Sequence, residues 1–168
     1  MEFESLYNEL LSNYKRIFEI SKITNLGDPF SYNRSREIIM SLTFGHKIAD
    51  TYSGADAIDN DGECEYKSTI GKSINGTYNG ISVQDSLENQ IEYIKNEKIG
   101  KYNNHYFARF NGADIVEAWT MKSEKVLEIL MPKIVKDYNR KSSTKTKDPR
   151  IGVTITKKEI YTYGTRMI

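Results

Sequence analysis

Residues 54–68 read GADAIDNDGECEYKS, and this stretch indicates two β-strands joined by a tight turn. Residues 60–62 (NDG) are of the types that favour turns. After them, residues 63–68 alternate with the period of a strand. Because side chains two residues apart in a strand share a face, we expect Glu65 and Lys67 to point the same way.

The elements on both sides of this stretch are indicated by hydrophobic periodicity, helix caps and turn signals. Apolar residues three and four apart predict helices over residues 3–20, 33–44, 86–98 and 123–134. Further strands are expected over residues 106–110, 115–121, 151–155 and 160–163, the first two joined by an Asn-Gly hairpin turn. The Gly-rich residues 71–82 and the basic residues 139–150 are expected to be loops. This order predicts an α/β (α+β) fold in which helices flank a mixed central β-sheet.

The length and composition restrict the class of protein. A chain of 168 residues with 38% hydrophobic and 28% charged residues suits a single domain, residues 1–168, that buries its own core. One Cys excludes an internal disulfide framework, and with two His a structural zinc centre is not expected. No apolar run approaches the roughly 20 residues of a membrane span. Residues 1–10 are acidic, unlike a signal peptide, so we expect a cytoplasmic protein without a membrane partner.

The first predicted helix, residues 3–20, carries a wide apolar stripe. Its members fall on helical spacing: Phe3, Leu6, Tyr7, Leu10, Leu11, Tyr14, Ile17 and Phe18. We expect this stripe to pack on the chain's own domain. The alternative is that it packs on a second copy, as a dimerisation element.

The charges are distributed unevenly along the chain. Residues 1–132 hold 14 basic and 20 acidic side chains, whereas residues 133–168 hold 10 basic and 3 acidic ones. A basic segment on an acidic body is compatible with a polyanionic partner such as nucleic acid. A solubilising Lys-rich end is the alternative reading.

Asp56, Glu65 and Lys67 form the candidate chemical constellation, because Asp56 is expected to lie alongside from the preceding strand. Two carboxylates supply hard oxygen ligands for Mg²⁺, and a lysine beside them can orient or deprotonate water, which is what metal-assisted phosphodiester hydrolysis requires. A solvated, charged strand edge is the alternative. A calcium loop around Asp59 and Asp61 is not expected, since Ala57 and Ser68 would occupy positions that need acidic ligands.

Three segments resemble the PD-(D/E)XK nuclease family, in particular its compact type II restriction endonucleases. Residues 54–68 resemble the active-site segment, and residues 148–153 (DPRIGV) and 163–168 (YGTRMI) resemble the closing segments in order and spacing. The similarity extends loosely from about residue 30 to the C-terminus. Two departures are a spacing from Asp56 to Glu65 that is one residue shorter, and Ala55 where the family often has proline.

The resemblance implies a restriction-endonuclease-like core and specific roles for its residues. Asp56 and Glu65 would bind the catalytic Mg²⁺ with help from the carbonyl of Tyr66, and Lys67 would act on the attacking water. The reaction would leave a 5′-phosphate and a 3′-hydroxyl. The partners would be double-stranded DNA with a short palindromic site and a second copy of the chain. The candidate DNA-binding residues are Asn33, Arg34, Arg36, Ser73, Asn75, Thr77, Tyr78, Asn79, Lys147 and Arg150.

Two other functions remain open at this point. A nuclease of the same fold that reads DNA structure, as in repair, would use the same three residues. A non-catalytic DNA-binding module would use the basic C-terminal segment alone. The two histidines, His46 and His105, are expected to serve packing and not general-base catalysis, and Cys64 and Trp119 are expected in the core.

Overall fold

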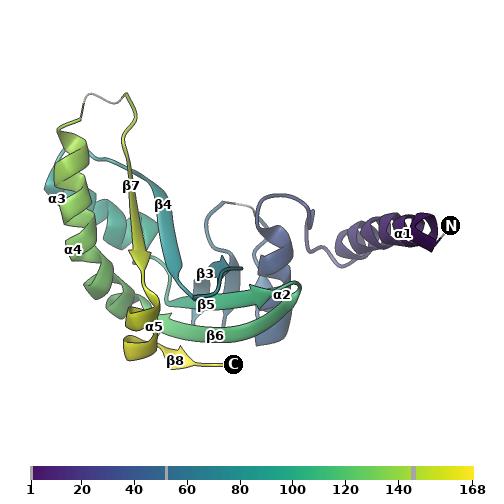
Figure 1. Ribbon diagram of the computed structural model, residues 1–168. Helices are drawn as coiled ribbons and strands as arrows, with labels where there is room; N and C mark the ends of the chain where they lie inside the picture. Colours follow the sequence, from purple (N-terminus) through teal and green to yellow (C-terminus); the bar gives the residue numbers. More distant parts are fainter. Residues whose placement is uncertain (1, 52, 145–146) are drawn as a thin grey trace.

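Five α-helices, one π-helix and eight strands make up the part of the chain that the computed structural model describes, residues 2–51, 53–144 and 147–168 (Figure 1). The helices are α1 (Glu2–Ile23), α2 (Arg34–Phe44), α3 (Leu87–Tyr93), η1 (Ile94–Lys98), α4 (Ser123–Ser142) and α5 (Lys157–Tyr163). The strands are β1 (Lys47–Ile48), β2 (Ala57–Asp59), β3 (Gly62–Thr69), β4 (Gly76–Ser82), β5 (Asn104–Asn111), β6 (Asp114–Lys122), β7 (Arg150–Ile155) and β8 (Thr165–Arg166). Helices and strands are mixed along the chain, as predicted.

The central sheet has the order β1-β2-β3-β5-β6-β8 and is mixed. The β3–β5 pair is parallel, with Glu65 opposite His105, and the other pairs are antiparallel. The predicted strand pair in residues 54–68 is confirmed as the β2–β3 hairpin, and the predicted Asn-Gly hairpin is confirmed as β5–β6. The sheet therefore places β3, with its alternating charged residues, at its centre.

Each face of the sheet has its own hydrophobic core. On β5, Phe107 packs into the cluster formed with α4, β4 and β7, whereas Tyr106 and Ala108 pack into the cluster under α2. Met40 of α2 is fully buried in the second cluster. Both faces are therefore covered, one by α4 and the ribbon described next, and the other by α2 (Figure 1).

The strands β4 and β7 form a separate two-stranded antiparallel sheet, the β4–β7 ribbon. Residues 76–82 were expected to be part of a loop, and this is wrong: only residues 71–75 lack regular structure. The strand forms because Tyr78 and Ile81 face the core while Thr77, Asn79 and Gly80 face solvent. The buried alternation outweighs the low strand propensity of the glycines.

The segment 160–163 is also corrected, because it belongs to helix α5 and not to a strand. A capping box starts this helix: the Thr156 hydroxyl accepts the Glu159 backbone N–H, and the Glu159 carboxylate accepts the Thr156 N–H. The expected basic loop over residues 139–150 is shorter than predicted, since α4 continues to Ser142. Its residues 145–146 lie outside the described residues.

The helix α1 covers the predicted residues 3–20 and continues to Ile23, but it does not pack as predicted. It projects away from the rest of the chain (Figure 1), and the residues of the predicted apolar stripe are exposed, from 44% for Phe18 to 71% for Phe3. The tilted contact between the rings of Tyr14 and Phe30, with centroids 5.6 Å apart, joins its C-terminal half to the following turn. Packing on its own domain is therefore wrong, because α2 and α4 already cover the two faces of the sheet.

Candidate active site

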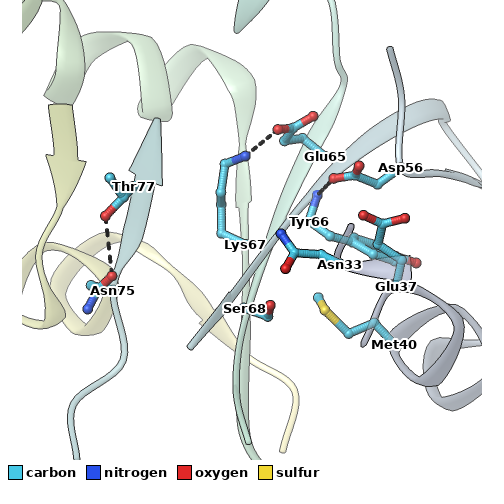
Figure 2. A pocket seen from close by; sticks show the side chains of 10 residues that line it. All are labelled: Asn33, Glu37, Met40, Asp56, Glu65, Tyr66, Lys67, Ser68, Asn75 and Thr77. Carbon is cyan, nitrogen blue, oxygen red and sulfur yellow. Dashed lines mark hydrogen bonds and ion pairs between the residues drawn. The ribbon is translucent and has the colours of Figure 1, made fainter. Parts of the chain in front are cut away.

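Asp56 lies immediately before β2 and is tied to the strands on both sides. Its backbone N–H donates to the carbonyl of Cys64 (3.1 Å), and its carbonyl accepts from the N–H of Ala49 (3.1 Å). Its carboxylate oxygen Oδ2 accepts the backbone N–H of Tyr66 at 2.7 Å (Figure 2). These bonds hold the carboxylate beside β3, as expected from the sequence.

Glu65 and Lys67 lie on the same face of β3, as predicted, and form a direct ion pair (Figure 2). Their side chains are 14% and 20% exposed, so the pair is largely shielded from water. Tyr66 points to the opposite face and is buried in the cluster under α2. Asp56, Glu65, Tyr66 and Lys67 together line a cavity of about 240 Å³.

The carboxyl group of Asp56 has an unusual proton affinity. Burial is the main reason, and the nearby charge of Glu65 adds to it, so that the pKa of Asp56 rises to about 7. The ammonium of Lys67 and the N–H of Tyr66 oppose this rise without cancelling it. A cation bound in the cavity would favour the ionised form of Asp56.

Glu37 is a third carboxylate of this cavity that the sequence analysis did not single out. It comes from α2, as does Met40, and Asn33, the residue before α2, also lines the cavity (Figure 2). Burial raises the pKa of Glu37, Arg34 opposes this, and the charge of Glu65 raises it further. Residues 33, 37 and 40 are spaced so that they share one helical face, and this spacing was the sequence feature that could have identified Glu37.

The donor set of the cavity suits a hard divalent cation in part. Among the described residues, no three His, Cys, Asp or Glu side chains converge into a ready-made metal site. Asp56 and Glu65 nevertheless line one shared cavity, where burial, and after it the charge of Glu65, raises the pKa of Asp56. This fits Mg²⁺, which is often held by one or two carboxylates and keeps several water ligands.

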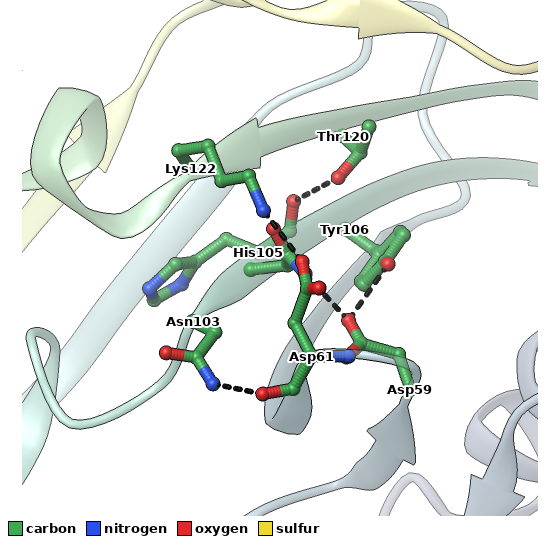
Figure 3. Close-up of polar contacts among 8 residues, drawn as sticks. Asp59, Asp61, Asn103, His105, Tyr106, Thr120 and Lys122 are labelled. Atoms are coloured by element: carbon green, nitrogen blue, oxygen red, sulfur yellow. Dashed lines mark hydrogen bonds and ion pairs between the residues drawn. The ribbon is translucent and has the colours of Figure 1, made fainter.

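The polar turn predicted at Asp59 and Asp61 is confirmed, and both carboxylates are bonded within the fold (Figure 3). Asp59 accepts hydrogen bonds from the Asn104 amide (2.7 Å) and the Tyr106 hydroxyl (2.8 Å), and Asp61 pairs with Lys122 at 2.6 Å. Burial would raise the pKa of Asp59, but the bonds from Asn104 and Tyr106 outweigh it and lower the pKa. Both carboxylates therefore fasten the turn between β2 and β3 to the neighbouring strands β5 and β6.

Two candidate DNA-binding residues are buried, which corrects their expected role. The guanidinium of Arg34 is 2% exposed and donates to the carbonyls of Leu26 (2.9 Å) and Ala49 (2.5 Å), so that it braces the start of α2. Tyr78 is 6% exposed and its hydroxyl is bonded to His105 at 2.8 Å. Neither side chain is placed to reach a base edge.

The other candidate DNA-binding residues reach the cavity or the surface. Asn33, Asn75 and Thr77 line the cavity (Figure 2). The remaining ones lie on the surface or partly exposed: Arg36, Ser73, Asn79, Lys147 and Arg150. The guanidinium of Arg150 bonds Asp148 at 2.7 Å and also contacts Ser82 across the β4–β7 ribbon.

A second cavity of about 220 Å³ adjoins the first, because Glu65 and Lys67 line both. Its walls include three residues that follow α3 in the chain, Lys98, Lys101 and Tyr102. No motif in the sequence marks these residues. They meet β3 because the chain crosses from β4 through α3 and η1 to pair β5 in parallel with β3.

The histidines and the cysteine lie where packing explains them. His46 bonds the hydroxyl of Tyr66 through Nδ1 at 2.7 Å, and burial lowers its pKa. His105 is fully buried. Cys64 is buried beside Ala57, and burial raises the pKa of its thiol, which makes it unreactive.

Trp119 is partly buried and stacks on Tyr161 with ring centroids 4.9 Å apart, so it lies at the border of the core and not inside it.

None of the described helices is both long and apolar enough to cross a membrane. No model of a known protein family matches the sequence, and no curated protein matches it either.

Proposed function

We propose that this chain is a Mg²⁺-dependent type II restriction endonuclease that cuts both strands of double-stranded DNA at a short palindromic site. One observation carries the proposal: Asp56, Glu65 and Lys67 converge on a single cavity beside the central strand. Two carboxylates and an ammonium are the groups that metal-assisted phosphodiester hydrolysis needs. The resemblance of three segments to PD-(D/E)XK nucleases supports the same reading.

The residues of the cavity have different roles in the proposed reaction. Asp56 and Glu65 are the residues that would hold Mg²⁺, together with the Tyr66 carbonyl that the family resemblance implies. When bound, the ion would supply positive charge to the phosphate and would lower the pKa of a water molecule. Lys67, as the ammonium of its ion pair with Glu65, would orient the attacking water by donating a hydrogen bond to it. The water oxygen adds to phosphorus and gives up a proton to solvent, the bond to the 3′ oxygen breaks, and the leaving oxygen takes a proton from solvent, which leaves a 5′-phosphate and a 3′-hydroxyl.

The outer face of the β4–β7 ribbon is the surface we assign to base recognition. Thr77 and Thr154 bond each other across the ribbon at 3.1 Å, and Asn79 lies against Gly152. A two-stranded ribbon fits the major groove, where hydroxyl and amide groups can read base edges. Arg36, Ser73, Lys147 and Arg150 would contact bases or phosphates around it, and Asn33 and Asn75 would lie at the cavity itself.

A second copy of the chain completes the proposal, because one active site cuts one strand and a duplex has two. A twofold dimer on a twofold site is the simplest solution. We assign the dimer contact to the exposed apolar face of α1.

The test is digestion of phage DNA by the purified chain with Mg²⁺. We expect discrete, reproducible fragments, and we expect Glu65→Ala and Lys67→Ala to lower the cleavage rate by at least about 10³-fold, given the size of comparable catalytic losses. Both variants should retain specific DNA binding in Ca²⁺. Glu63→Ala is the matched control, because Glu63 lies on the same strand but is exposed and does not line the cavity.

The alternatives give different results in the same assay. Smeared products or nicks confined to branched DNA would indicate a structure-specific or repair nuclease. Salt-sensitive binding with no hydrolysis at any Mg²⁺ concentration would indicate a DNA-binding module without catalysis. Full activity of Lys67→Ala would overturn the assignment of the site.

A further inference from the structure

A buried tyrosine lies directly beneath the ammonium of Lys67. Tyr78 comes from β4 and turns its ring into the core, with the Lys67 Nζ atom 4.8 Å from the ring centroid. An ammonium over the face of an aromatic ring is attracted by the ring quadrupole, and the attraction is stronger where water is excluded. Lys67 is therefore held from below as well as by its ion pair with Glu65.

The ring of Tyr78 is itself fixed by His105. The His105 Nε2 atom lies 3.2 Å from the carbonyl of Ile99, which only accepts, so Nε2 carries the proton. The Nδ1 atom is then an acceptor and receives the hydroxyl proton of Tyr78 at 2.8 Å. Ser123 adds a second contact to Nε2 at 3.2 Å. Both ends of the imidazole are thus satisfied, and Tyr78 has one defined position.

The Tyr78–His105 pair stays uncharged. Burial, followed by the charge of Lys67, lowers the pKa of His105 to about 3, and burial raises the pKa of Tyr78. Neither residue therefore competes with Lys67 for a proton or presents a charge to it. What the pair presents to the ammonium is the aromatic face.

The aliphatic part of the Lys67 side chain is confined by β4, the strand that carries Tyr78. A Cβ atom on Gly76 would lie 3.5 Å from Lys67 Cγ and 2.3 Å from the ring of Phe107. The absence of a side chain at Gly76 therefore lets β4 approach β3 and bring Tyr78 under the ammonium. The distance between β4 and β3 at this point is set by the glycine.

We propose that Tyr78 is the positioning residue of Lys67, and that the Tyr78–His105 pair is the platform that holds the ammonium between the two cavities. The placement of Lys67 does not depend on the proposed nuclease function. Its consequence for the cleavage rate does depend on it.

The placement is tested by nuclear magnetic resonance on protein labelled with ¹³C-lysine. Protons held over an aromatic ring are shifted upfield by its ring current, so we expect the ε-protons of Lys67, assigned with Lys67→Arg, to be displaced from those of the other lysines. Tyr78→Phe keeps the ring and should keep most of the displacement. Tyr78→Leu removes the ring and should abolish it. An undisplaced Lys67 signal in the unmodified protein, or an unchanged one in Tyr78→Leu, would overturn the proposal, and the first result is readable even if Tyr78→Leu does not fold.

Single-turnover cleavage separates the role of Tyr78 from general stability. We expect Tyr78→Leu to slow cleavage roughly 10- to 100-fold, the effect of a small misplacement of a catalytic group, with DNA affinity in Ca²⁺ unchanged. Tyr78→Phe should lose less. Tyr138→Phe is the control, because Tyr138 is buried in the same core cluster and bonds the Gln84 carbonyl instead. Absence of cleavage by the unmodified protein, with a displaced Lys67 signal, would reject the nuclease and leave the platform standing.

Discussion

The carboxylate of Asp56 accepts the backbone N–H of Tyr66 at 2.7 Å, which fixes it on β3 between the two neighbours of Tyr66, Glu65 and Lys67. The hydrogen bond favours the ionised carboxylate, but burial and the charge of Glu65 outweigh it. A carboxylate that is held in place by a hydrogen bond, but whose charge is disfavoured by burial, is typical of a functional site. A bound cation would favour its ionised form. These two effects lead to two predictions about Asp56.

The first concerns stability without metal. Because the pKa of Asp56 is raised to about 7 in the folded chain, the folded state binds the proton more tightly than the unfolded state does. The stability that the Asp56 carboxyl contributes to the folded state is therefore present at acidic pH and is lost as the pH rises from about 4 to about 7. We expect Asp56→Asn to be more stable than the unmodified protein at pH 8 in EDTA, by roughly 2–4 kcal/mol. The difference should shrink toward pH 5 in thermal unfolding.

The control for this experiment is Asp114→Asn, which changes an exposed carboxylate in the β5–β6 hairpin. Its thermal unfolding, measured in parallel, gives the effect of replacing an exposed carboxylate that does not line the cavity. Equal stability of Asp56→Asn and the unmodified protein across the range from pH 5 to pH 8 would contradict the assigned burial of Asp56.

The second prediction concerns proton release on metal binding. A cation held by Asp56 and Glu65 favours the ionised form of Asp56, so binding must release a proton wherever that carboxyl is still protonated. We expect the apparent affinity for Mg²⁺ or Ca²⁺ to rise by up to about tenfold per pH unit below pH 7 and to level off above it. Calorimetry in two buffers with different ionisation enthalpies counts the protons. Asp56→Asn should release none, and identical heats in both buffers at pH 6.5 would refute the coupling.

The third prediction contrasts two glycines of the β4–β7 ribbon. A Cβ on Gly152 would lie 2.8 Å from Asn79 Oδ1, the movable end of an exposed side chain, whereas a Cβ on Gly76 would lie 2.3 Å from the buried ring of Phe107. We expect Gly152→Ala to change stability by less than about 1 kcal/mol while it alters which DNA sites are cut. Gly76→Ala should cost about 1–3 kcal/mol or more, as overpacked cores do. Chemical denaturation and sequencing of fragment ends measure the two effects, and unchanged cleavage sites in Gly152→Ala would count against recognition by Asn79.

The parts of the site that could be predicted from the sequence are those held by local structure. Asp56, Glu65 and Lys67 lie within one hairpin, so the alternation of β3 and a single turn are enough to bring them together. Glu37, Lys98 and Tyr102 reach the cavities through α2 and through the crossover to β5. Their positions depend on the packing of distant segments, which no local pattern records.

The errors have physical causes as well. Arg34 resembles a DNA-binding arginine in sequence, but the carbonyls that bury it come from Leu26 and Ala49, which only the fold brings to it. Residues 160–163 are rich in residues with high strand propensity, yet the capping box at Thr156 and Glu159 begins a helix there. The apolar stripe of α1 was predicted correctly, whereas periodicity cannot specify the surface that covers it.

The last prediction concerns that stripe. Phe3, Tyr7, Leu10, Tyr14 and Ile17 repeat at alternating intervals of four and three residues, which is the spacing of a helix that packs on another helix. The helix α1 exposes all five in the single chain, and burial of such side chains stabilises each by about 1.5–3 kcal/mol. We therefore expect a dimer in sedimentation at micromolar concentration.

Leu10→Glu should convert the dimer to a monomer, because it places a charge in the middle of the apolar face. Ser12→Glu, which adds the same charge outside the five-residue repeat, should leave the dimer intact. The monomer should still bind Mg²⁺, since the Asp56 and Glu65 carboxylates belong to one chain, but it should nick DNA on one strand where the dimer cuts both. A monomeric unmodified protein, or double-strand cutting by monomeric Leu10→Glu, would show that α1 serves another purpose and that the two cuts arise without this contact.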